Sequence, residues 1–142
     1  MKKFFSKVDK SILLYVINEY DSIEEKRKDL SPETECLQAS CKKLKKTDFF
    51  KPHKHLPLER NTVQTQEAWV ILDGKIHAKF YDIDDTLYSD HVLKSGDCVV
   101  AFNAGHCFEV LEDDTRLYEF KNGPYYGMLK DKKDIDESGK WR

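Results

Sequence analysis

Residues 69–81, with the sequence WVILDGKIHAKFY, decide the expected fold. Two apolar runs in this stretch flank the pair Asp73-Gly74. An Asp-Gly pair between apolar runs is a strong signal of a two-residue β-hairpin, because a type I′ turn needs positive φ at both central residues. The spacing therefore predicts an antiparallel hairpin in which Trp69 pairs with Ala78.

Polar turn signals recur through the rest of the second half and separate further short apolar runs. Short strands that alternate with turns about every 8–12 residues are typical of an all-β sandwich or barrel. Residues 56–66 are polar, contain Pro57 and are expected to form a loop. Strands are expected outside the hairpin at residues 11–20, 36–44, 49–55, 87–88, 98–102, 106–111 and 116–121. For residues 11–20 a helix is the alternative, because Leu13, Val16, Ile17 and Tyr20 also fit helical spacing.

The composition is that of a single folded domain. The chain has 142 residues, of which 39% are hydrophobic and 12% aromatic, so it can form a core without a disulfide or a structural metal. Lys and Arg number 24 and Asp and Glu 26, and this net charge of −2 gives no electrostatic case for nucleic acid as a partner.

The apolar run that begins at Ile12 is too short to span a membrane, and residues 1–9 lack the apolar region of a signal peptide. The four cysteines form no CxxC pair. We therefore expect reduced thiols in a cytoplasmic protein that has neither a membrane nor a nucleic acid as its partner.

His53 and His55 are the first residues with metal-binding chemistry. Positions i and i+2 of a strand point to the same face, so the expected strand 49–55 would aim both imidazoles at one point. Two histidines at this spacing are more often coincidence than ligands, and the pair alone does not establish a site.

Glu67 falls on the core face of the predicted hairpin, with the parity of Trp69 and Ile71. A carboxylate on a core face is costly unless it is paired or binds a metal. The alternative is that Glu67 lies at the open end of the strand and meets water. His106 follows Gly105 and opens another strand, and imidazoles with one carboxylate around a cavity suit Fe, Mn, Ni, Cu or Zn better than Ca or Mg.

The pattern of these residues resembles the cupin family. The first cupin motif is G-x5-H-x-H-x3,4-E-x6-G, and the second is G-x5-P-x-G-x2-H-x3-N. The resemblance covers about residues 34–121 and includes the complete E-x6-G part of the first motif. The matching positions are His53, His55, Glu67, Gly74, Gly96 and His106.

The resemblance implies a double-stranded β-helix, a small jelly-roll-like barrel, at residues 34–127. An N-terminal arm at residues 1–33 and a polar tail at 128–142 would flank it. The resemblance also implies a divalent transition metal (Fe, Mn, Ni or Zn) inside the barrel. The implied metal ligands are His53, His55, Glu67 and His106.

The chain departs from the first motif between His55 and Glu67. Eleven residues separate them where the motif has three or four, so a loop is inserted. Glu59 fits the spacing after His55 and is the rival carboxylate ligand, but Gln66 stands where the motif then requires glycine.

The resemblance favours metal-dependent chemistry of the isomerase, epimerase or lyase type on a small carbohydrate-like or carboxylate substrate. The alternatives are a non-haem metal dioxygenase, a non-catalytic cupin that binds a sugar or another small molecule, and a cupin with a vestigial metal site. Glu59 and Lys121 are the candidates for proton transfer. The expected substrate contacts are Arg60, Gln64, Trp69 and Phe102. The apolar N-terminal arm is typical of one that adds a strand to a neighbouring subunit, so we expect a homodimer.

Overall fold

The computed structural model describes residues 1–135, so the predicted tail at 128–142 lies partly outside the described residues. The described part is mostly β with antiparallel strands, as the turn spacing predicts. Its strands are β1 (Lys2–Phe5), β2 (Leu13–Asn18), β3 (Lys28–Asp29), β4 (Ser40–Cys41), β5 (Glu67–Asp73), β6 (Lys75–Tyr81), β7 (Leu87–Lys94), β8 (Cys98–Ala101), β9 (Gly105–Val110) and β10 (Arg116–Lys121), and its short helices are η1 (Tyr20–Ser22) and α1 (Met128–Asp131).

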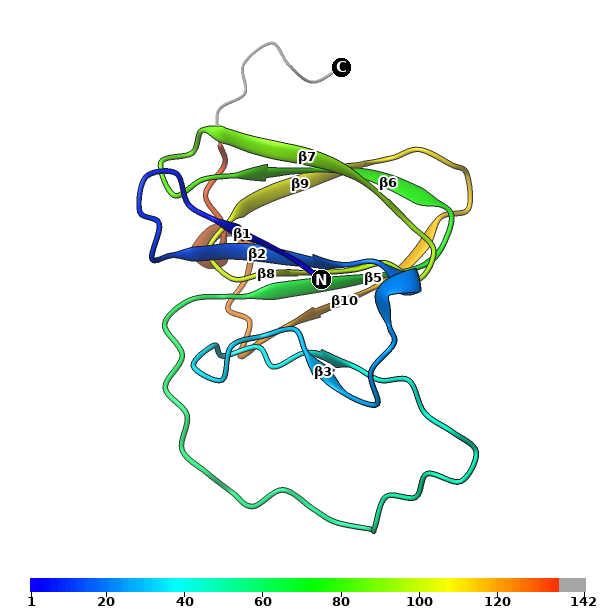
Figure 1. Ribbon diagram of the computed structural model, residues 1–142. Helices are drawn as coiled ribbons and strands as arrows, with labels where there is room; N and C mark the ends of the chain where they lie inside the picture. The colour runs from blue at the N-terminus through cyan, green and yellow to red at the C-terminus, as the bar shows by residue number, and fades with distance from the viewer. Residues whose placement is uncertain (136–142) are drawn as a thin grey trace.

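The strands form three layers. A five-stranded sheet has the order β1-β2-β8-β5-β10, and a three-stranded sheet has the order β7-β6-β9. These two sheets lie face to face, and the β3-β4 pair lies on the other side of the five-stranded sheet (Figure 1). The five-stranded sheet is therefore the middle layer. None of the described helices is long and apolar enough to cross a membrane.

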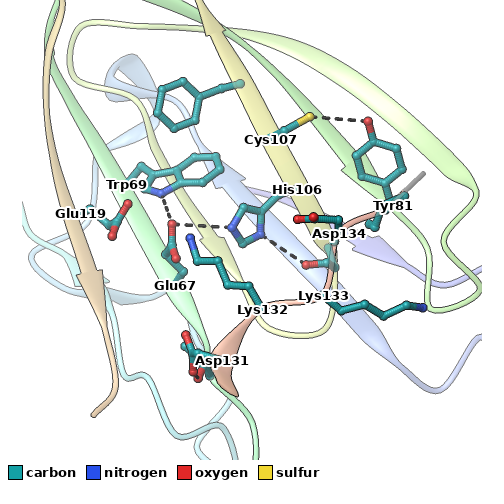
Figure 2. Close-up of a pocket in the computed structure, with 15 residues that line it drawn as sticks. Glu67, Trp69, Tyr81, His106, Cys107, Glu119, Asp131, Lys132, Lys133 and Asp134 are labelled. Carbon is teal, nitrogen blue, oxygen red and sulfur yellow. Dashed lines mark hydrogen bonds and ion pairs between the residues drawn. The ribbon is translucent and has the colours of Figure 1, made fainter. Parts of the chain in front are cut away.

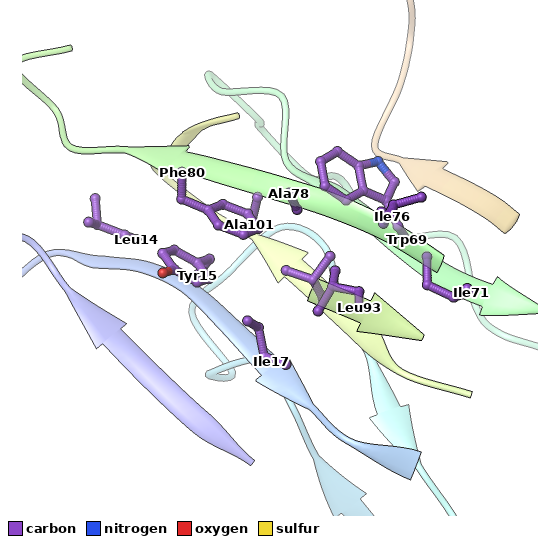
Figure 3. Packing of buried hydrophobic residues seen from close by; sticks show 11 residues of the cluster. Leu14, Tyr15, Ile17, Trp69, Ile71, Ile76, Ala78, Phe80, Leu93 and Ala101 are labelled. Atoms are coloured by element: carbon purple, nitrogen blue, oxygen red, sulfur yellow. The ribbon is translucent and has the colours of Figure 1, made fainter. Parts of the chain in front are cut away.

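Aromatic stacking joins the two large sheets. Tyr15 of β2 stacks on Phe80 of β6 with ring centroids 3.9 Å apart (Figure 3). Phe4 of β1 stacks on the same tyrosine with ring centroids 4.4 Å apart. Tyr15 and Phe80 are fully buried. A second apolar cluster, with Val16 and Phe102, lies between the five-stranded sheet and the β3-β4 layer. Every residue of β2 is buried because its sheet is covered on both faces.

The predicted hairpin at Asp73-Gly74 is wrong, although its two strands exist. β5 pairs with β8 and β10, whereas β6 pairs with β7 and β9 in the other sheet. Among the described residues, Asp85 and Asp114 are the non-glycine residues with positive φ, so Asp73 lacks the φ that a type I′ turn requires. Gly74 has a φ of 76°, and a side chain there would collide with Thr115.

The chain thus crosses from one sheet to the other at Gly74. The predicted core face of each strand remains correct. Trp69 and Ile71 pack against Ile76 and Ala78 across the core, and not as neighbours within one sheet.

Strands predicted in the first half are partly wrong. Residues 49–55 are not a strand but extended coil, and the run 36–44 is reduced to β4. Pro52 and Pro57 have no N–H, so they cannot donate to a sheet ladder. The expected strand at 11–20 is present as β2. Residues 1–33, expected to form an arm, supply β1 and β2 to the chain's own five-stranded sheet.

Phe80→Ala should lower the free energy of unfolding by about 3–5 kcal/mol, because it removes a buried ring and leaves a cavity beside Tyr15. Phe49→Ala is the matched control, since Phe49 is 79% exposed and its loss should change stability by no more than about 0.5 kcal/mol. Urea unfolding followed by circular dichroism measures both, and equal losses would contradict the described core.

Candidate functional site

Glu67 is the first residue of β5 and lies between two neighbouring strands, opposite Ala101 of β8 and Lys121 of β10. Its side chain points to the core face, and only 8% of that side chain is exposed. Bulk water cannot hydrate such a carboxylate, so the protein must supply its hydrogen-bond donors.

Trp69 and His106 contact one oxygen of that carboxylate. Trp69 donates a hydrogen bond from Nε1 to Glu67 Oε1 at 2.6 Å. His106, on β9 of the facing sheet, places Nε2 3.6 Å from the same oxygen (Figure 2), which is an ion-pair distance rather than a hydrogen bond. The indole and imidazole rings meet edge to face with centroids 4.9 Å apart. Glu67 therefore links the two sheets.

The second ring nitrogen of His106, Nδ1, contacts the backbone. Nδ1 lies 3.3 Å from the carbonyl oxygen of Ala104, and a carbonyl oxygen can only accept. Nδ1 is therefore the donor in this contact, and Nε2 is the nitrogen that faces Glu67.

Lys121, the last residue of β10, contacts the other oxygen of Glu67. Its Nζ lies 3.3 Å from Glu67 Oε2 and 2.8 Å from Glu119 Oε1. The hydrogen bond with Glu119 raises the pKa of the Lys121 ammonium; burial opposes this shift, and the charge of Glu67 adds to it. Lys121 is thus held as a cation beside the buried carboxylate.

The environment of Glu67 keeps it ionised. Burial by itself raises the pKa of the Glu67 carboxyl, but the contacts with His106, Trp69 and Lys121 outweigh burial and lower that pKa to about 2. At neutral pH Glu67 is therefore a permanent acceptor and a permanent negative charge at the junction of the sheets.

A pocket of about 590 Å³ opens above this group of side chains. Its volume is in the range of small-molecule sites. Trp69, Phe108 and Tyr81 form apolar walls, while Glu67 and His106 supply polar atoms (Figure 2). The arrangement combines a fixed carboxylate, an imidazole and aromatic surface around a space of the size of a small ligand.

The residues as placed do not fit the four-ligand metal site that the cupin resemblance implies. His53 and His55 lie exposed in the coil that precedes β5, and their ring centroids are 5.6 Å apart. Across residues 1–135, no three side chains of His, Cys, Asp or Glu are grouped so as to hold a metal. In addition, the Lys121 ammonium and the Trp69 N–H already occupy the carboxylate of Glu67.

Of the remaining predicted site residues, some lie at the site and others lie away from it. Trp69 and Lys121 lie at the site. Glu59, Arg60 and Gln64 are exposed in the same coil as the paired histidines, and the structure does not bring them to the pocket. Phe102 is buried in the second apolar cluster, between the five-stranded sheet and the β3-β4 layer, so it does not line the pocket.

Sequence reasoning missed part of the pocket lining. Glu119 shares its parity along β10 with Lys121, and that alternation is the one signal that could have identified it. Thr65, Tyr81 and residues 131–135 also line the pocket. Residues 131–135 have no periodicity or motif that could have identified them. Contacts with distant residues determine where they lie.

Comparison of the chain with known protein families, with curated proteins and with solved structures finds no match.

The stability of the protein should depend on pH through Glu67. The pKa of this carboxyl is about 2 in the folded protein and 4.5 ordinarily. Between these two pH values the unfolded chain therefore binds more protons than the folded protein. The stabilisation is fully present above pH 4.5 and is lost as the pH falls toward 2. Urea unfolding at stepped pH should show a larger loss in the wild type than in Glu67→Gln, because only the other carboxyls with lowered pKa, such as those of Asp82 and Asp90, contribute to the acid loss in the variant.

Glu67→Gln should also lower stability at pH 7 by about 1–3 kcal/mol, because Lys121 loses a buried partner. Glu112→Gln is the control, since Glu112 forms a half-exposed ion pair with Lys75. If the free energy of unfolding falls equally with pH in the wild type and in Glu67→Gln throughout the acid range, the described contacts of Glu67 are contradicted.

Proposed function

We propose that this protein binds a small polar molecule in the pocket and catalyses a proton transfer on it, in a reaction of the isomerase or epimerase type. The observation that carries this proposal is the contact between buried Glu67 and Nε2 of His106 at the wall of the pocket. A carboxylate beside an imidazole stabilises the imidazolium that forms when the ring accepts a proton, so such a pair can act as a general acid–base.

In the proposed reaction, the pair formed by Glu67 and Nε2 of His106 accepts a proton from a carbon next to a carbonyl group. The electrons of the C–H bond form a carbon–carbon double bond, and those of the carbonyl π bond move to its oxygen, which gives an enolate. The proton then returns to the opposite face of the same carbon, which restores the carbonyl group. In an isomerisation the proton instead goes to the former carbonyl carbon, after the neighbouring hydroxyl group of the substrate has given its proton to the first carbonyl oxygen. Glu67 stabilises the imidazolium formed in between. Lys132, whose side chain points into the pocket toward Glu67 (Figure 2), supplies a cation for the negative oxygen. Lys121 acts through Glu67 and is a positioning residue.

The fold proposal is a cupin-type barrel whose walls are the two facing sheets. Two features support it. The chain crosses between the sheets at Gly74, and Glu67 and His106, which the resemblance brings to one centre, lie 3.6 Å apart.

A metal-binding protein is the second candidate function, and the coil before β5 favours it. Several apolar side chains of this coil are exposed, and exposed apolar segments tend to find partners. β9 is the last strand of its sheet in the described part of the chain, so its edge offers unpaired backbone groups. Addition of residues 49–58 as an edge strand would cover apolar surface and bring His53 and His55 toward His106. The exposed side chains are Phe49 at 79%, Phe50 at 54%, Leu56 at 77% and Leu58 at 70%.

The first proposal predicts exchange of substrate protons with solvent. Wild-type protein incubated in D₂O with a panel of aldoses and ketoses should replace the proton next to the carbonyl of one of them, as followed by proton NMR. His106→Gln should slow this exchange at least about a hundredfold, because it removes the acid–base group.

His77→Gln is the matched control, since His77 lies on the other face of β6 and contacts Asp90 at 2.6 Å. Equal exchange by His106→Gln and wild type would contradict the proposal. Shifts of pocket resonances without exchange would instead favour the non-catalytic sugar-binding alternative.

The second candidate predicts about one bound metal ion per chain in protein purified without chelators or added metal, as measured by elemental analysis. The double variant His53→Ala/His55→Ala should lose this metal, whereas His77→Ala should retain it. Equal metal content in both variants would rule out the paired histidines as ligands. Consumption of dioxygen by an iron- or manganese-loaded form would point to the dioxygenase alternative.

A further inference from the structure

The last described residues cross the mouth of the pocket. Asp131, Lys132, Lys133, Asp134 and Ile135 all line it, although they lie far along the chain from β5 and β9. Figure 2 shows this segment passing in front of the space between Glu67 and Tyr81. Residues 131–135, called the strap here, therefore form a wall of the pocket that neither sheet supplies.

Polar contacts attach the strap at two places. Thr65 Oγ1 donates a hydrogen bond to Asp131 Oδ1 at 2.6 Å. Lys133 Nζ forms an ion pair with Asp85 Oδ2 at 2.8 Å, and Asp85 lies in the turn between β6 and β7. The two attachments lie before and after Lys132, whose side chain points into the pocket.

An apolar contact attaches the far end. Ile135 is half-buried, and its Cδ1 lies 2.5 Å from the position that a Cβ on Gly105 would take. The absence of a side chain at Gly105 thus leaves the hollow that Ile135 fills. Gly105 is the neighbour of His106, so the strap rests on the strand that carries the acid–base group.

These attachments are too weak to hold the strap closed permanently. The Lys133 side chain is 82% exposed and that of Asp85 46%, and an exposed ion pair of this kind changes an equilibrium by about fivefold at most. The strap has no strand partner in the described chain. It can therefore open without disturbing the two sheets.

We propose that the strap is a lid that closes the pocket, with Ile135 in the hollow at Gly105 as its latch, and that it opens to admit the ligand. The gating of a ligand rests on the proposed function, whereas the closure itself does not. A closed strap excludes water from the space around His106, which strengthens the electrostatic contacts made there.

Trp69 reports on the closure because it lines the pocket. The chain has two tryptophans, Trp69 and Trp141, so Trp141→Phe leaves Trp69 as the single tryptophan, which can be excited selectively over the tyrosines. In this background Ile135→Ser should raise the acrylamide quenching constant of Trp69 by about twofold or more, because the open pocket admits the quencher. Leu129→Ser is the matched control, since Leu129 precedes the strap and is 95% exposed.

Equal quenching in the two serine variants, with unchanged unfolding midpoints, would overturn the proposal. A drop in the midpoint of Ile135→Ser alone would do the same, since it would assign Ile135 to the stability of the sheets. A second measurement uses Cys107, which also lines the pocket: its rate of alkylation by iodoacetamide relative to exposed Cys36 should rise in Ile135→Ser.

A double-mutant cycle tests the ion pair. Lys133→Ala and Asp85→Asn should each raise the quenching of Trp69, and the double variant should raise it no further, because both remove one contact. Asparagine suits the positive φ of 66° at position 85. Lys130→Ala, a loss of an exposed lysine from α1, should leave quenching unchanged. Additive effects, or none, would overturn this attachment.

The proton-exchange experiment separates the two proposals. If Ile135→Ser exposes Trp69 while no sugar exchanges a proton in the wild type, the lid stands and the proposed function fails. If exchange occurs but its rate and the quenching of Trp69 are the same in Ile135→Ser and Leu129→Ser, the function stands and the lid fails.

Discussion

The buried carboxylate of Glu67 is the constraint on which the arrangement of the site depends. A charge that is only 8% exposed needs partners from the protein, and three elements provide them: β5 through Trp69, β9 through His106 and β10 through Lys121. Two of these strands belong to the five-stranded sheet and one to the facing sheet. The requirement to satisfy one carboxylate thus fixes the spacing of the sheets where the pocket opens.

The pocket combines rigid and mobile parts. Glu67, Trp69 and His106 lie on β5 and β9, and the stacked rings of Tyr15 and Phe80 hold together the two sheets that contain these strands. The rim comes from chain outside the sheets, held by exposed polar contacts and one apolar latch. Such a division places chemical groups accurately and leaves entry to segments whose opening costs little.

The sequence predicts much of the second half of the chain and less of the first. The strand positions of β8, β9 and β10 follow from apolar runs and turns, and the burial of Glu67 follows from its parity with Trp69. The pairing at Gly74 could not be predicted, because a turn that leads to the neighbouring strand and one that crosses to a facing sheet share the same Asp-Gly signal. The strand expected around His53 is absent since Pro52 and Pro57 interrupt the ladder and no partner strand pairs with it.

The sequence by itself determined which residues face inward, because the side chains of a strand alternate whatever the strand pairs with. This is why it assigned Glu67 and Trp69 to one face of a strand, whereas only the cupin resemblance joined His106 to them. Only the tertiary structure decided which groups meet there. The neighbours of Glu67 across the sheets, Lys121 and His106, and the strap that covers them depend on contacts between residues far apart in the chain, and local patterns carry no information about such distances.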